Sequence, residues 1–150
     1  MTLQLRPRML DDFGLTPALR WHAENFTKMT GIALSVSIIL PTARIGRELE
    51  VAAYRLVQEG LTNVARHSGA PSAALSVDLK DEVMTVRLED RGKGFETQKG
   101  LAKHDSVGLS GLIERVRLVG GSLVIESMVG QGTTLLAQFP VETERSNRRA

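Results

Sequence analysis

The sequence has no cysteine, no long apolar run and no strong excess of either charge. Without cysteine it can form neither disulfides nor a thiolate metal site, so it favours neither an oxidising nor a reducing compartment. The apolar stretch IALSVSIIL is much shorter than the roughly 18 residues of a membrane span, and it contains two serines. The start of the chain has no signal-peptide pattern. We therefore expect a soluble domain.

The composition that remains is typical of one globular domain. The chain has 150 residues, of which 42% are hydrophobic and 24% charged, which is enough to build a sizeable core. Lys and Arg number 19 against 17 Asp and Glu, a net charge of +2. Part of this excess lies in the final ERSNRRA, so we interpret residues 142–150 as a disordered basic tail rather than a nucleic-acid arm.

Hydrophobic periodicity predicts three helices and five strands. A first helix is expected from Pro17, with Thr16 as its N-cap and Gly31 as its stop. A long amphipathic helix covers 48–68, and a third helix around 109–119 ends at Gly120 and Gly121. The expected strands lie at 32–38, 73–79, 83–88, 122–127 and 133–139. The apolar faces of these helices and strands must be buried against one another, which predicts an α+β fold with three helices on one face of a five-stranded sheet.

The stretch EDRGKGFE at 89–96 combines acids, a Gly-x-Gly and an aromatic residue. A dinucleotide fingerprint would require G-x-G-x-x-G at the start of a helix. Phe95 and Glu96 follow here without a third glycine, so that motif is excluded. The stretch needs another ligand to explain it.

The long helix carries a second unusual group. Glu59 and Asn63 are four residues apart, so they share a face about 6 Å apart along the axis, and Arg66 and His67 extend that edge. By itself this edge could be a solvated helix border. Gly60 costs about 1 kcal/mol relative to alanine in a helix interior, which indicates close packing or a ligand.

Two further glycine motifs have both a plain and a functional interpretation. VGLSGLIERV at 107–116 could be a simple helix entry, or a helix N-terminus where glycines let phosphates approach free N–H groups. GQGTTL at 130–135 predicts a tight hairpin turn leading into a strand.

Together the four motifs carry a resemblance that none carries separately. The order is Glu59 to Asn63, then Asp90-x-Gly-x-Gly, then Gly108-x-x-Gly, then Gly130-x-Gly-Thr. It resembles the N, G1, G2 and final Gly-Thr boxes of the ATP-binding domain shared by histidine kinases, DNA gyrase B, Hsp90 and MutL. LVQEGLTNVARHSGA and GLSGLIERVRLVGGSLVIES resemble sensor histidine kinases paired with helix-turn-helix response regulators. The resemblance covers residues 45–141 and implies a two-layer α/β sandwich of the Bergerat type with a mixed sheet.

The resemblance implies a nucleotide site. In the family, the G1 aspartate accepts a hydrogen bond from the adenine amine, a role that falls on Asp90, and bare backbone at Gly92 and Gly94 lies against the purine. An unpaired buried polar group costs about 1 to 3 kcal/mol, so ATP should be preferred to GTP by about tenfold or more. Thr133 would bond near the adenine, directly or through water. The other nucleotide-binding positions implied are Gly108, Leu109, Gly111 and Leu112.

The resemblance also implies a metal and a catalytic base. Asn63 matches the N-box asparagine that ligates Mg²⁺, Glu59 matches the glutamate that acts on the attacking nucleophile, and Arg66 could balance phosphate charge. His67 is expected to be a supporting contact. Residues 96–106 would form a lid over the phosphates, hinged at Gly100 and Gly108.

The chain departs from a whole kinase in having no phosphoacceptor helix. His104 precedes Asp105, but it falls in the expected lid, and His22 is interpreted as structural. We therefore expect a catalytic fragment, with 1–14 leaving a missing dimerisation hairpin, 15–141 binding ATP and 142–150 as the tail. The implied partners are ATP, Mg²⁺, that hairpin and a response regulator, with no direct nucleic-acid or membrane contact. The fragment should be monomeric and cytoplasmic, although the full protein could be membrane-anchored.

Two alternatives stay open at this point. A stand-alone serine kinase of the anti-sigma-factor type shares the fold and the boxes, but the hairpin-exit sequence at 3–15 argues against it. A regulatory nucleotide-binding module without transfer activity would not need Glu59.

Overall fold

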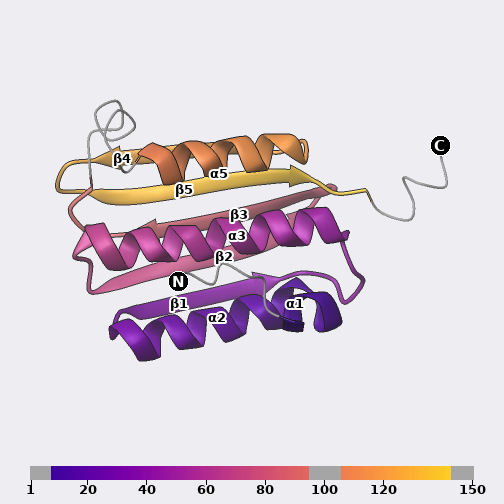
Figure 1. The fold of residues 1–150 in the computed structure, drawn as a ribbon, viewed down its shortest axis with the longest axis horizontal. Helices are drawn as coiled ribbons and strands as arrows, with labels where there is room; N and C mark the ends of the chain where they lie inside the picture. The colour runs from indigo at the N-terminus through magenta and orange to yellow at the C-terminus, as the bar shows by residue number, and fades with distance from the viewer. Residues whose placement is uncertain (1–7, 95–105, 143–150) are drawn as a thin grey trace.

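In the computed structural model, residues 8–94 and 106–142 are described, and within them five strands form one mixed sheet. The strand order is β1-β2-β3-β5-β4, with β1 parallel to β2 and the remaining neighbours antiparallel (Figure 1). The strands are β1 Ala33–Ile39, β2 Ser72–Lys80, β3 Val83–Asp90, β4 Ser122–Met128 and β5 Gly132–Pro140. Both expected hairpins, β2–β3 and β4–β5, are confirmed.

The helices cover one face of this sheet. Figure 1 shows α2 over β1, α3 over the middle strands and α5 over β4 and β5. This arrangement confirms the expected two-layer α+β architecture. No helix in the described part of the chain is long and apolar enough to cross a bilayer. The bounds are α1 Arg8–Phe13, α2 Leu15–Thr30, α3 Arg47–Asn63, the π-helical turn η1 Val64–Ser68 and α5 Ser106–Leu118.

The core lies between the two layers, because successive strand residues alternate between the faces of the sheet. Leu75 on β2 pairs with Leu88 on β3, which pairs with Leu135 on β5, and all three are buried under the helices. From the helical side, α3 buries Leu56, Val57 and Leu61. The long amphipathic helix is thus the central element of the helical layer.

The start of α2 differs from the prediction. The helix begins at Leu15, with Gly14 at the N-cap position, so Thr16 lies inside the first turn and is not the N-cap. The reason is α1, which runs to Phe13 and leaves a single residue for the change of direction; the Gly14 N–H donates to Leu10 O over 3.1 Å. The predicted stop is confirmed, because Gly31 is left-handed and its N–H donates to Thr27 O.

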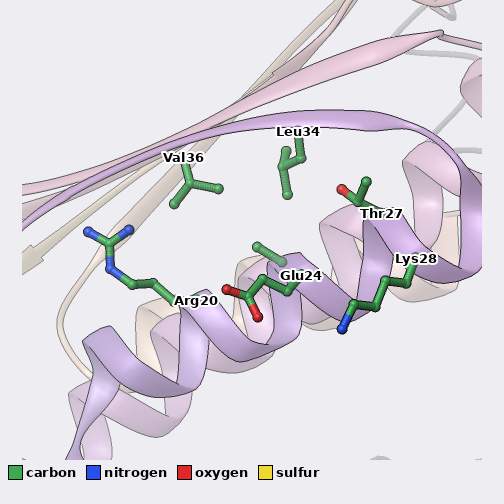
Figure 2. A pocket seen from close by; sticks show the side chains of 7 residues that line it. Arg20, Glu24, Thr27, Lys28, Leu34 and Val36 are labelled. Carbon is green, nitrogen blue, oxygen red and sulfur yellow. The ribbon is translucent and has the colours of Figure 1, made fainter.

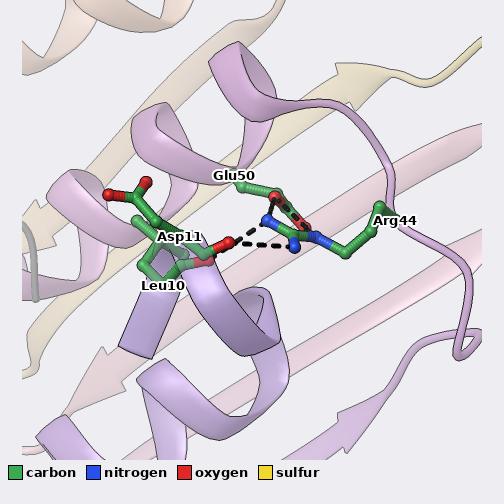
Figure 3. A network of polar contacts seen from close by, with 4 residues as sticks. All are labelled: Leu10, Asp11, Arg44 and Glu50. Carbon is green, nitrogen blue, oxygen red and sulfur yellow. Dashed lines mark hydrogen bonds and ion pairs between the residues drawn. The ribbon is translucent and has the colours of Figure 1, made fainter. Parts of the chain in front are cut away.

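A polar network joins α1 to the first turn of α3. The Arg44 guanidinium contacts both carboxylate oxygens of Glu50, at 2.7 Å from Nη2 to Oε1 and 3.0 Å from Nε to Oε2. It also donates to the Leu10 and Asp11 carbonyls at the end of α1, as Figure 3 shows. Glu50 is 3% exposed, so its charge is balanced almost entirely by Arg44. The network fixes α1 against the base of the central helix.

Candidate functional site

Three polar side chains form a row across one end of the sheet. Asp90 on β3 pairs with Thr133 on β5, which pairs with Ser127 on β4. The row lies on the helix-covered face, next to the apolar row that contains Leu88 and Leu135. Asp90 and Ser127 are each 8% exposed and Thr133 is half-buried. A carboxylate and two hydroxyls therefore replace the apolar side chains at the edge of the core.

The Asp90 carboxylate is held by backbone donors. The Gly92 N–H donates to Asp90 Oδ1 over 2.8 Å, two residues along the chain. Burial raises the pKa of Asp90, and hydrogen bonds from the Gly92 and Thr133 backbone N–H groups partly offset that rise. These bonds orient the side chain while its other lone pairs remain able to accept a donor from a ligand.

The glycine pattern brings two backbone segments together beside this row. A Cβ on Gly94, whose φ is +64°, would overlap the Met128 carbonyl oxygen, and a Cβ on Gly132 would overlap the Asp90 carbonyl oxygen. The Gly130 N–H also donates to Lys93 O over 2.5 Å. The loop after β3 is thus packed on the β4–β5 turn, which gives Gly94 a structural reason in addition to the purine contact expected from the sequence.

Helix α3 packs closely above the adjoining apolar row. A Cβ on Gly60 would lie 2.6 Å from Leu88 Cδ2 and 3.0 Å from Leu135 Cδ1. Of the two meanings that the sequence left open for Gly60, the structure therefore shows close packing. Asn63, one turn further along, ends the helix at the same end of the sheet as Asp90 (Figure 1). Glu59 and Asn63 are both half-buried.

The helix continues beyond Asn63 as the π-helical turn η1. Such turns are rare and occur frequently at functional sites. Arg66 lies in this turn and is exposed, whereas the side chain of His67 lies outside the described residues. At the end of the turn, a Cβ on Gly69 would be 3.3 Å from Lys93 Cε in the loop after β3. The turn therefore reaches the loop that follows Asp90.

Helix α5 supplies the third side of the region. It begins at Ser106, so the N–H groups of its first residues, which include that of Gly108, lack partners within the helix. Gly111 is exposed, and a Cβ there would meet nothing within 4 Å. Leu112 is 3% exposed and packs in the core, so its side chain does not line an open site. The side chain of Leu109 lies outside the described residues.

Part of the predicted site falls on residues that the structure does not describe. These are Phe95 and residues 96–105 of the expected lid, which include the hinge Gly100 and His104.

His22 is described, and its side chain is half-buried between α2 and α3. Its Nδ1 lies 3.4 Å from the Tyr54 hydroxyl, the two rings meet edge to face, and burial lowers its pKa. These contacts fit the structural role expected for His22.

A groove of about 400 Å³ lies elsewhere, between α2 and β1. Figure 2 shows Arg20, Glu24 and Lys28 of α2 on one side of it, with Leu34 and Val36 of β1 on the other. Because β1 is an edge strand and β2 separates it from β3, the groove is distinct from the polar row. We assign it no ligand.

Ser127 was missed by the sequence analysis. The feature of the sequence that could have indicated it is a serine at an inward-facing position of the strand SLVIESM, in which side chains alternate between the two faces of the sheet. This position lies opposite Thr133 in the β4–β5 hairpin. Position alone did not show that two hydroxyls would be 2.8 Å apart beside a carboxylate.

The side chains present fit a purine nucleotide and its metal. Asp90 offers a hydrogen-bond acceptor beside an apolar floor, which suits an aromatic base that carries an amine. No group of three or more His, Asp or Glu in the described ranges could hold a metal by itself. A magnesium ion here would need oxygen ligands from phosphates, with Asn63 as a protein ligand, which is typical of Mg²⁺ at nucleotide sites.

Comparisons with known proteins agree on one family. The family model for histidine kinase-, DNA gyrase B-, and HSP90-like ATPases matches residues 48–143. The chain is 38% identical over 141 residues to the signal transduction histidine-protein kinase/phosphatase DegS of Brevibacillus brevis, covering 93% of this chain and 36% of that protein. It is 32% identical over 141 residues to the oxygen sensor histidine kinase NreB of Staphylococcus carnosus, covering 94% and 40%. The chain thus spans well under half the length of these relatives.

A solved structure shares the fold. The histidine kinase domain of the Erythrobacter litoralis EL346 blue-light activated histidine kinase superposes with a TM-score of 0.70 at 22% identity. The match covers 85% of this chain and 61% of that one. Because the family model covers well over half of the sequence, the chain belongs to the family of histidine kinase-, DNA gyrase B-, and HSP90-like ATPases.

Proposed function

We propose that this chain is the ATP-binding catalytic domain of a two-component sensor histidine kinase. It binds ATP with Mg²⁺ and transfers the γ-phosphate to a histidine on a dimerisation hairpin, which in turn serves a helix-turn-helix response regulator. Such a domain works in the cytoplasm, where ATP is available, and the isolated chain is monomeric. The polar row of Asp90, Thr133 and Ser127 is the observation that carries this proposal.

Two observations support histidine phosphorylation against the alternative functions. The curated relatives are named histidine kinases and align over more than nine-tenths of this chain. Glu59 lies one turn before the end of α3, and a module that only binds nucleotide would not require this glutamate. We therefore place the serine kinase of the anti-sigma-factor type and the non-catalytic module behind histidine phosphorylation.

In the proposed reaction, an imidazole nitrogen of the hairpin histidine forms a bond to the γ-phosphorus. The bond from that phosphorus to the β,γ-bridging oxygen breaks, and ADP leaves. Glu59 accepts the imidazole proton or polarises the ring, and Arg66 offsets phosphate charge. Most of the rate enhancement in this type of reaction comes from positioning and charge neutralisation. Asn63 would hold the magnesium ion, which supplies that neutralisation when bound.

Nucleotide binding is the first test. Isothermal titration of the chain with ATP and with GTP, both with magnesium, should give an affinity for ATP about tenfold higher or more, because guanine presents an oxygen to Asp90. Equal affinities would overturn the assignment of Asp90 to the adenine amine.

Phosphotransfer is the second test. With labelled ATP and the separately supplied hairpin, Glu59→Gln should bind ATP as the wild type does but phosphorylate the hairpin about 100-fold more slowly or worse. Glu48→Gln, at the exposed start of the same helix, is the matched control and should retain full activity. An acid-labile product identifies phosphohistidine, and an acid-stable phosphoserine would favour the anti-sigma type instead.

A further inference from the structure

The two hydroxyls of the polar row form a directed pair. Ser127 Oγ lies 2.8 Å from Thr133 Oγ1 and 3.1 Å from the carbonyl oxygen of Gly132. Ser127 is 8% exposed, and Thr133 lies between it and Asp90. The pair is therefore fixed in the interior, and its hydrogen-bond directions follow from chemistry.

A carbonyl oxygen can only accept, so Ser127 must donate its hydroxyl proton to Gly132 O. Ser127 has one such proton, and hence Thr133 must be the donor in the contact between the two hydroxyls. The single hydroxyl proton of Thr133 is thereby committed to Ser127. What Thr133 has left to offer a ligand is the lone pairs of Oγ1.

We propose that Ser127 is a positioning residue that makes Thr133 an obligate acceptor, so that the site selects purines with an amine at position 6. The inference rests on the proposed ATP site. Asp90 and Thr133 are direct cross-strand partners, so two acceptors stand side by side at the end of the sheet. An exocyclic amine carries two N–H groups and can satisfy both. In a 6-oxo purine, the oxygen at position 6 is itself a hydrogen-bond acceptor, so it would face the two acceptors of Asp90 and Thr133 without a proton between them.

The test is a nucleotide series measured by calorimetry. Wild type and Ser127→Ala are titrated with ATP, with inosine triphosphate, which has a 6-oxo group, and with purine riboside triphosphate, which has no 6-substituent. Removing the serine frees the Thr133 proton, so Thr133 can donate to the oxo group. The ratio of ATP to inosine triphosphate affinity should fall about fivefold, the worth of one neutral hydrogen bond. Affinity for the unsubstituted purine should stay within about twofold.

Two further variants separate positioning from structural damage. Ser127→Thr retains the hydroxyl and should keep the wild-type ratio. In a Thr133→Val background the serine substitution should change the ratio no further, because the group it orients is gone. Urea unfolding of each variant checks the fold, and Ser127→Cys, a weak donor, replaces the alanine variant if that variant is unstable.

The outcomes are distinct. A uniform loss of affinity for all three nucleotides in Ser127→Ala would show a packing role only and overturn the inference, as would an unchanged ratio. Failure of the wild type to bind any of the three would instead overturn the proposed function, and the inference with it.

Discussion

Replacing Gly60 by alanine tests how closely α3 packs over the site. In a helix interior alanine is favoured over glycine by about 0.8–1.0 kcal/mol. The new methyl group, however, would lie 2.6 Å from Leu88 Cδ2 and 3.0 Å from Leu135 Cδ1, so those side chains or the helix must shift. Overpacking of this kind costs about 1–3 kcal/mol. The expected net effect is a loss of about 0–2 kcal/mol of unfolding free energy.

Gly111→Ala is the matched control. It is also inside a helix, but a Cβ there would meet nothing within 4 Å, so only the propensity gain should appear. The propensity terms cancel between the two variants, and their stabilities should differ by the overpacking cost alone, about 1–3 kcal/mol. In a domain of this size, that separates their melting temperatures by about 2–4 °C per kcal/mol.

Urea unfolding followed by circular dichroism measures this difference. Where α3 rather than the leucine side chains shifts, Gly60→Ala should also weaken ATP binding, because this helix carries Glu59 and Asn63. Adding Leu88→Val should recover part of the lost stability, since it removes a methyl group from the contact. If Gly60→Ala were as stabilised as Gly111→Ala, the close contact of α3 with β3 and β5 would be refuted.

Three other predictions follow from the same geometry. Burial raises the pKa of Asp90 above its ordinary value of 3.8. The folded state therefore binds more protons than the unfolded chain, and this contribution to stability is lost as the pH rises from the ordinary pKa through the raised one. Asp90→Asn removes the titrating carboxyl group, so its unfolding free energy relative to the wild type should increase as the pH rises above about 4, while it loses ATP affinity; a difference in stability that stays constant with pH in urea unfolding would contradict the pKa shift. Glu50→Gln should cost about 1–2 kcal/mol by thermal melting, reduced from the value for a fully buried pair because its arginine partner is 45% exposed. Glu89→Gln, in an exposed pair, should cost under about 0.5 kcal/mol, and equal losses would contradict the role of burial. Gly94→Ala should cost more than Gly130→Ala, because both positions have positive φ but only Gly94 also meets a carbonyl oxygen; similar unfolding midpoints would argue against the packed loop.

Much of the fold could be read from the sequence because its signals are local. The stripe of α3, the two hairpins and the Gly31 stop depend on periodicity and on residues close in the chain, and all of them appear in the structure. The predicted start of α2 was wrong by two residues because α1 occupies the chain up to Phe13, and a six-residue helix has no clear period of its own.

For the site, the sequence by itself determined which chemical groups are present and in what order, since the four boxes are short contiguous motifs around Glu59, Asn63 and Asp90. Only the tertiary structure decided what those groups contact. Cross-strand register placed Ser127 beside Thr133, Gly60 proved to be the point where a helix meets the sheet, and Arg44 was brought to Glu50 and the end of α1. The Gly60 contacts and the bonds from Arg44 to the end of α1 depend on the relative placement of whole elements, and that placement is set by packing of the shared core rather than by neighbouring residues in the chain.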